Sequence, residues 1–283
     1  MRRIEPRVLG RPGGFPSPKR LLRLPDLSGR QALTLILVGA FVWSALQVNW
    51  SGDLVHSGGG AVLLELLEGL ARPDLSGGIL SGAAEAAWTT VVFAVAGLSV
   101  ALVVAIPLSL AASGVLVANP RLRRWTTAPA RTFLSLLRSV HELVWAWLFV
   151  AAIGLSPFAA IFALAIPYAG ILGRIYADRL TDVPDPPLRA LRSSGAGETR
   201  VLLYGRLPMA AADLASYTFY RFECGLRSAA IMGFVGIGGL GLQIQLALDD
   251  LAYSQASTYL LFLIALIALV EVWSSQLRKR LVT

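Results

Sequence analysis

Charged side chains interrupt two stretches of the sequence that are otherwise apolar. In residues 132–154 and 209–235 they form two groups of three, Arg138, His141 and Glu142, and Arg221, Glu223 and Arg227. On a helix, residues three or four positions apart share one face, which places Arg138, His141 and Glu142 together. Glu223 and Arg227 have the same spacing. Ionisable residues inside a membrane span are functional candidates by default.

Two interpretations of these charges stay open. In the first they line a substrate pathway, because an oxyanion in a low-dielectric layer needs partners and the arginine fork offers several donors in one plane. His141 would add a proton-dependent charge. In the second, Arg138 neutralises Glu142, Arg227 neutralises Glu223, and the pairs clamp the two spans together. Residues two positions apart on a helix are separated by about 200° around its axis, so Arg221 and Glu223 cannot lie on one face.

Composition requires that these residues sit in a membrane protein. The chain has 283 residues, of which 55% are hydrophobic and 15% charged, with a mean hydropathy of +0.65. Soluble domains carry about 25% charged residues, and disordered chains are poor in apolar ones. The net charge of +8 does not indicate a nucleic-acid binder, because such a domain would not be this apolar. The single cysteine, Cys224, excludes a disulfide framework and a cysteine-based zinc site.

Six stretches are long and apolar enough to cross a bilayer, which predicts an all-α, polytopic membrane helical bundle. They run over residues 31–49, 86–112, 132–154, 157–177, 209–235 and 257–275. Most of the 25 Lys and Arg residues lie in 1–30, 119–131, 174–206 and at the C-terminus. Positive residues collect in cytoplasmic loops, so six alternating spans place these segments, and both termini, in the cytoplasm.

The predicted organisation follows from the spans. A basic cytoplasmic N-terminal segment (1–30) precedes the first transmembrane helix (31–49). The external, periplasmic segment (50–84) contains a short apolar helix at 61–70 that lies on the membrane surface or on the bundle. The transmembrane core covers 85–277, and a cytoplasmic tail covers 278–283.

The longest cytoplasmic loop, 185–208, predicts a compact knob of two short helices. Asp185 can cap a helix that has prolines in its first turn. Gly195 suits the left-handed position that ends a helix, and a second turn, 198–204, precedes Pro208 at the start of the fifth span. A plain amphipathic loop at the interface is the alternative.

The same loop resembles the coupling-loop signature of ABC importer permeases. The matching residues are Ala190, Gly195, Leu207 and Pro208, with Leu191 beside Ala190. Arg189 replaces the family's Glu, and Gly205 replaces its Ile. Two further stretches, RSVHELVWAWLFV at 138–150 and YRFECGLRSAAIMGFVGIGGLG at 220–241, resemble phosphonate-type permeases. The resemblance covers roughly residues 60–277.

The resemblance implies a multi-pass bacterial inner-membrane subunit with the type I ABC importer permease fold. Its partners would be a second permease chain, identical or paralogous, two ATPase subunits and an extracytoplasmic binding protein. The solute would be a phosphonate or a related phosphorus oxyanion such as phosphite, phosphate or a phosphate ester. The ATPase would be contacted by Arg189, Ala190, Leu191, Gly195, Leu207 and Pro208.

Several functions are disfavoured by the residues themselves. The chain has no G-x-x-x-x-G-K-[ST] loop, so we expect it to bind no cofactor and to leave ATP and Mg²⁺ to the ATPase. We expect a transport subunit and no enzyme. Only His56 and His141 are present, which disfavours a metal site. The alternatives are an ABC permease for another small solute and a secondary transporter.

A glycine-rich stretch follows the fifth span: Gly236, Ile237, Gly238, Gly239, Leu240 and Gly241. It matches G-x-G-x-x-G, but a dinucleotide site needs that pattern after a strand. We expect it to close the pathway on the periplasmic side, with Ile237 and Leu240 as apolar plugs. A plain turn between spans is the alternative.

Overall fold

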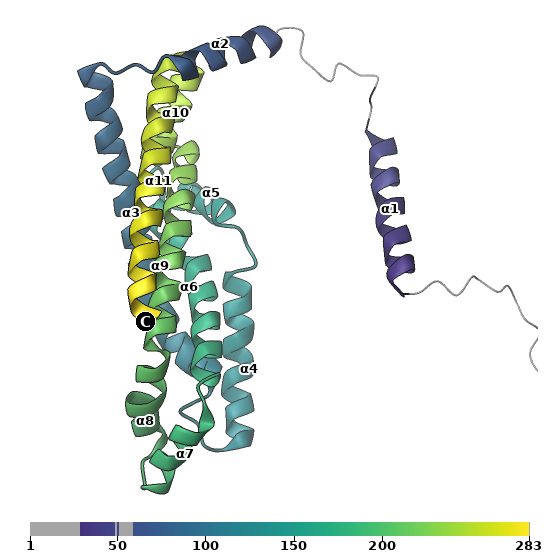
Figure 1. Ribbon diagram of the computed structural model, residues 1–283, viewed down its shortest axis with the longest axis vertical. Coiled ribbons are helices and arrows are strands. Elements are labelled where there is room, and N and C mark those ends of the chain that lie inside the picture. Colours follow the sequence, from purple (N-terminus) through teal and green to yellow (C-terminus); the bar gives the residue numbers. More distant parts are fainter. Residues whose placement is uncertain (1–28, 49, 51–58, 283) are drawn as a thin grey trace, which may run out of the picture. The chain divides into compact units, whose positions relative to one another are not determined.

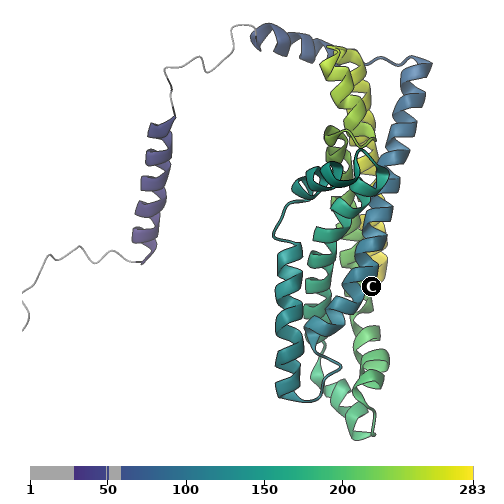
Figure 2. The ribbon, with the colours of Figure 1, turned by 180° about the vertical axis from the view of Figure 1, so that it is seen from behind.

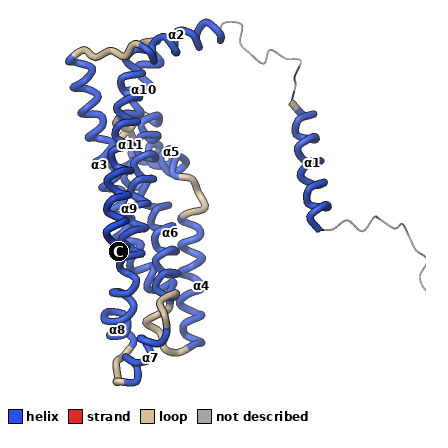
Figure 3. Tube along the Cα trace, viewed as in Figure 1, coloured by secondary structure: helices blue, strands red, loops and turns tan. Residues whose placement is uncertain are grey.

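The computed structural model describes residues 29–48, 50 and 59–282, and every regular element in these ranges is a helix (Figures 1 and 3). The chain divides into two compact units, Met1–Gly59 and Gly60–Thr283. The first unit contains α1 (Gly29–Gln47), whose apolar side chains are exposed. Exposed apolar side chains on a 19-residue helix are typical of a span that faces lipid. The prediction for 1–28 and for the loop 51–58 lies outside the described residues.

Five long helices form the bundle of the second unit. They are α3 (Gly77–Ser113), α4 (Pro120–Leu137), α6 (Pro157–Thr181), α9 (Leu207–Met232) and α11 (Tyr253–Val282). Shorter elements connect them: α2 (Gly59–Ala71), α5 (Glu142–Ile153), α7 (Asp185–Ser193), α8 (Glu198–Val201), the π-helix η1 (Leu202–Arg206), the 3₁₀ turn η2 (Gly233–Val235) and α10 (Leu240–Asp249). Figures 1 and 2 show α7 and α8 at one end of this bundle and α2 at the other.

Helix α6 lies in the core of the bundle, and small residues on its buried face let neighbouring helices pack closely against it. Ala159, Ala160 and Ala163 are fully buried. A Cβ atom on Gly97 of α3 would lie 2.8 Å from Cβ of Leu164. Small residues let membrane helices approach closely, since packing and not water exclusion drives their association. The close contact of α3 and α6 therefore follows from residue size.

The third predicted span is not one helix. Helix α4 ends at Leu137 and α5 begins at Glu142, with an angle of 79° between them. The His141 side chain accepts a hydrogen bond of 3.3 Å from the N–H of Leu143 and thereby caps α5. The predicted shared face of Arg138, His141 and Glu142 is therefore wrong, because a helix break separates the first from the other two. The described residues contain five helices able to cross a membrane, or six if α4 and α5 form one span.

Other boundaries differ in informative ways. Helix α3 begins at Gly77, well before residue 86, and α11 continues to Val282 through the residues expected to form a tail. The fifth span has no break at Pro208, because α8, η1 and α9 follow each other directly. Proline lacks an N–H and its ring clashes with the carbonyl of the preceding turn. The π-turn Leu202–Arg206 ends two positions before Pro208, which lies in the first turn of α9.

Candidate functional site

Arg221 is half-buried and lies among three tyrosines, of which Tyr220 is exposed. Its guanidinium carbon is 5.3 Å from the ring centre of Tyr168 on α6, 5.6 Å from that of Tyr217 and 5.8 Å from that of Tyr220. Nη2 donates a 2.8 Å hydrogen bond to the Tyr217 hydroxyl. Within the described ranges no carboxylate pairs with Arg221, and its buried Nε has no hydrogen-bond partner. Tyrosine faces stabilise a cation without neutralising it.

Glu223 points to the opposite side of α9, as its angular offset from Arg221 predicts. Its buried carboxylate lies 3.2 Å from Nη1 of Arg278 on α11 and 3.6 Å from Nη2 of Arg227. Arg227 also lies 3.3 Å from Glu271. The predicted pairing of Glu223 with Arg227 is confirmed. The four charges balance, but they join the fifth span to the last helix and not to the third.

The third and fifth spans are joined by hydrogen bonds. Ser228 Oγ donates to Oε1 of Glu142 at 2.6 Å, and the Tyr168 hydroxyl lies 3.1 Å from the same Oγ. Since the Ser228 proton is directed to Glu142, Tyr168 is the donor in the second bond. Nε2 of His141 is 3.8 Å from Oε2 of Glu142.

Arg138 takes no part in this contact. It is exposed and makes no ion pair within the part of the chain that the structure describes. The predicted ion pair between Arg138 and Glu142 is therefore wrong. Its physical reason is the helix break, which moves α5 off the axis of α4.

The loop 185–208 folds into the expected knob. Gly195 has φ +85°, the predicted left-handed conformation, and a Cβ there would meet nothing within 4 Å. Across this turn, Arg192 donates two hydrogen bonds to the carboxylate of Glu198, of 2.9 Å from Nε and 3.1 Å from Nη2. The hydrogen bond raises the pKa of Arg192 above its usual value. The two short helices are thus held together by a charged fork.

Two details of the knob differ from the prediction. Asp185 is the first residue of α7 and makes no capping hydrogen bond, but it lies 3.2 Å from Arg189 and 3.6 Å from Arg192. Leu207 and Pro208 continue the helix from η1. The knob is therefore connected to α9 by a continuous helix.

The knob has an inner apolar face and an outer polar one. Leu188 is fully buried, and a Cβ on Gly205 would lie 2.8 Å from its Cδ2. Gly205 therefore admits α7 against η1, which explains glycine at this position. Arg189 and Ala190 are exposed on the outer face, where a partner can reach them.

The glycine-rich stretch is a tight turn with buried apolar residues. Gly236, Gly238 and Gly239 have φ +89°, +125° and +79°. The N–H of Leu240 donates a 3.0 Å hydrogen bond to Oγ1 of the buried Thr90 on α3. Leu240 is fully buried and Ile237 nearly so. The structure places both predicted plugs in the core of their own chain, so neither is displayed toward an open path here.

Gly241 has a separate packing role in this turn. A Cβ at Gly241 would collide with the carbonyl oxygen of Ala230. The glycine therefore lets α10 pack directly against the end of α9.

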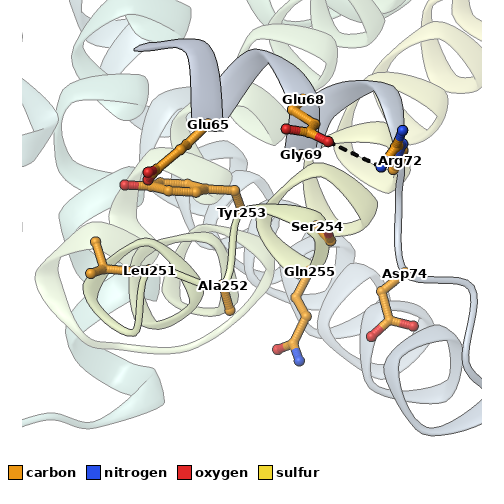
Figure 4. Close-up of a pocket in the computed structure, with 10 residues that line it drawn as sticks. All are labelled: Glu65, Glu68, Gly69, Arg72, Asp74, Leu251, Ala252, Tyr253, Ser254 and Gln255. Carbon is orange, nitrogen blue, oxygen red and sulfur yellow. Dashed lines mark ion pairs between the residues drawn. The ribbon is translucent and has the colours of Figure 1, made fainter. Parts of the chain in front are cut away.

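The predicted short periplasmic helix is α2, and it packs on the start of α11. Ser257 Oγ donates to the carbonyl of Gly69 at 2.8 Å, and Thr258 Oγ1 donates to the carbonyl of Asp74 at 2.8 Å. A pocket of about 430 Å³ lies between the two segments. Figure 4 shows Glu65, Glu68 and Arg72 on one side of it, with Arg72 paired to Glu68 at 3.0 Å, and Tyr253 on the other.

Several site residues were not identified from the sequence. Tyr217 precedes Arg221 by four positions, and this spacing could have indicated their contact. Tyr168, Ser228 and Arg278 could not have been found, because they depend on how separate helices pack. Within the described ranges, no cluster of three or more metal-ligating side chains occurs.

Comparison with known proteins places these features in context. Residues 110–282 match the family model described as the binding-protein-dependent transport system inner membrane component. The phosphite transport system permease protein PtxC of Stutzerimonas stutzeri is 33% identical over 190 residues, which cover 67% of this chain and 68% of that protein. The phosphate-import permease protein PhnE of Mycolicibacterium smegmatis (strain ATCC 700084 / mc(2)155) is 31% identical, over 67% of this chain and 35% of that protein.

A solved structure matches as well. A chain of the MetNI methionine ABC transporter, in an inward-facing conformation, superimposes with a TM-score of 0.63 at 18% identity. The match covers 73% of this chain and 99% of that one.

Proposed function

The chain belongs to the binding-protein-dependent transport system inner membrane components, and on that premise we propose that it carries a phosphorus oxyanion into the cell. Family membership makes it an ABC importer permease and a multi-pass protein of the bacterial inner membrane. It has the fold of a type I importer permease. The proposal adds the solute class, namely phosphonate, phosphite, phosphate or a phosphate ester.

The proposal also covers the partners. A second permease chain, identical or paralogous, would complete the pathway, and an extracytoplasmic binding protein would deliver the solute. Two ATPase subunits would bind ATP and Mg²⁺, and the knob at 185–208 would dock on one of them. The exposed residues Arg189 and Ala190 suit that contact, and the continuous helix from η1 into α9 suits transmission of movement.

The observation that carries the proposal is the state of Arg221. Ion pairs neutralise four of the charges, those of Glu223, Arg227, Arg278 and Glu271. These pairs favour a role in clamping α9 to α11. Arg221 lies among aromatic rings and lacks a carboxylate partner among the described residues. A half-buried guanidinium with free donor capacity is suited to bind the oxygens of an oxyanion. The relatives of this chain include permeases named for phosphite and phosphate.

The test is solute-stimulated ATP hydrolysis by the purified complex with its binding protein. We expect phosphite, phosphate or a phosphonate to stimulate hydrolysis, while methionine and sulfate do not. Arg221→Gln should abolish stimulation, and Arg221→Lys should retain part of it because it keeps the charge but loses the planar fork. The exposed Arg280→Gln is the matched control for loss of one positive charge. Full stimulation in Arg221→Gln would remove this residue from the pathway, and stimulation only by another solute would refute the substrate class.

A further inference from the structure

A second pocket, which is basic, lies at the opposite end of the bundle from α2, beside the knob. It has a volume of about 390 Å³ and is enclosed by the end of α3, α4, the end of α6, α7, α8 and η1. Its charged lining residues are Arg123, Arg192, Arg206 and Glu198. Arg192 uses Glu198 as its bidentate partner. Three positive charges therefore face one negative charge, and that one is already engaged.

The other two arginines keep donor capacity. Arg206 donates from Nη1 to the carbonyl of Leu180 at 2.7 Å, but its Nε is buried and has no partner within the described ranges. Arg123 makes no ion pair within the same ranges. Its side chain runs across Gly114, where a Cβ would lie only 2.6 Å from Cγ of Arg123. The glycine thus admits the arginine stem to the pocket wall.

We propose that this pocket binds a phosphorus oxyanion on the predicted cytoplasmic side, as a site separate from the transport pathway. The guanidinium groups of Arg123 and Arg206 approach from two elements and offer planar sets of donors to the oxygens of a phosphate group. The pocket lies between Arg123 on α4 and Arg206 in η1, so a bound oxyanion bridges the bundle to the knob. The same chemistry is available from free phosphate and from the headgroup of an anionic lipid.

The consequence of occupancy is mechanical. The knob is attached to its neighbours through the Arg192–Glu198 fork and the Arg206–Leu180 hydrogen bond. An oxyanion held by Arg123 and Arg206 adds a third attachment, between α4 and η1. A bound oxyanion would in this way restrict the movement of the knob, the segment proposed to dock on the ATPase.

The experiment measures binding of radiolabelled inorganic phosphate to the full chain in nanodiscs of phosphatidylcholine at constant ionic strength. We expect saturable binding that Arg123→Gln and Arg206→Gln each weaken at least about tenfold, the loss expected for a charged hydrogen bond. Arg124→Gln, the exposed neighbour of Arg123 outside the pocket, should remain within about twofold of the wild type. If Arg206→Gln fails to fold, Arg123→Gln alone decides, because Arg123 is exposed.

A second arm identifies the source of the oxyanion. The same proteins are placed in nanodiscs with phosphatidylglycerol, and retained lipid is counted by native mass spectrometry. Retention by the wild type and Arg124→Gln but not by Arg123→Gln, without binding of free phosphate, would identify a lipid headgroup as the occupant. Equal phosphate binding and equal lipid retention in Arg123→Gln and Arg124→Gln would overturn the proposal. Transport is not measured, so this result is independent of the solute carried.

Discussion

Replacing Ser228 by alanine separates the observed contact between α5 and α9 from the ion pair that the sequence had indicated. Ser228 is buried and its hydroxyl lies between Glu142 and Tyr168, at 2.6 Å and 3.1 Å. The substitution removes the donor to a carboxylate and the acceptor of a tyrosine hydroxyl. It leaves both groups in place without that partner.

The magnitude follows from burial and charge. A hydrogen bond to a charged group contributes about 1.5–3 kcal/mol. The Glu142 side chain is 21% exposed, so water partly replaces the lost donor and we take the lower half, about 1.5–2 kcal/mol. A domain of this size loses about 2–4 °C of Tm per kcal/mol, and Ser228→Ala should therefore lower the Tm by about 3–8 °C.

The assay is thermal unfolding of the detergent-solubilised chain, followed by size-exclusion chromatography. Ser216→Ala on the same helix is the matched control, because no hydrogen bond of its hydroxyl occurs in the described ranges. Arg138→Ala should also stay within about 0.5 kcal/mol of the wild type, as expected for an exposed residue without a partner. A Tm loss in Arg138→Ala equal to that in Ser228→Ala would refute the reasoning and support the predicted ion pair between Arg138 and Glu142.

Three further outcomes are expected. Gly195→Val should cost about 1–2 kcal/mol through its positive φ alone, leaving membrane insertion intact while ATPase stimulation falls; stimulation at the wild-type level would contradict a coupling role. Gly241→Ala should sharply reduce the folded yield, because its Cβ would collide with a backbone carbonyl, whereas Gly78→Ala, with nothing near its Cβ, should not; equal yields by fluorescence-detected chromatography would count against the packing at this turn. In a Cys224→Ser background, Leu240→Cys should resist labelling by a hydrophilic maleimide and Phe234→Cys should be labelled. The reason is that Leu240 is fully buried and Phe234 is 46% exposed. Rapid labelling of Leu240→Cys would indicate that Leu240 faces the open pathway.

The sequence sufficed where the signal is local. The apolar stretches predict the long helices, because about 20 apolar residues are what a bilayer selects. The left-handed Gly195 and the pairing of Glu223 with Arg227 depend on neighbours within a few positions, and the structure confirms both. The short helix at 61–70 is α2 for the same reason.

The sequence failed where contacts join distant segments. The break within 132–154 falls at residues 138–141, which include no proline or glycine, so hydropathy alone favours one span. The break instead coincides with the cap that His141 provides to α5. Ser228 and Glu142 are separated by 86 positions, and only the packed bundle brings them together. The sequence predicts a cytoplasmic tail at 278–283, yet Arg278 lies on α11 and reaches Glu223.

The glycine-rich stretch illustrates a third limit. The sequence predicts a gate here, with a plain turn as the alternative, and the positive φ angles at three of the four glycines show that the backbone turns tightly. Residue type alone does not say whether Ile237 and Leu240 face a path or a core. Burial on α3 and the hydrogen bond to Thr90 decide that question for this structure, while the periplasmic gate itself stays a prediction.

Uptake of radiolabelled phosphite, phosphate and methylphosphonate into proteoliposomes tests the central claim most directly. The vesicles would contain this chain, its partner permease and the ATPase, with the binding protein outside and ATP inside. We expect at least one of the three solutes to accumulate only when ATP and the binding protein are both present, and Arg221→Gln to prevent accumulation while the complex stays assembled. Accumulation without ATP, or ATP-driven uptake confined to solutes that contain no phosphorus, would contradict the account.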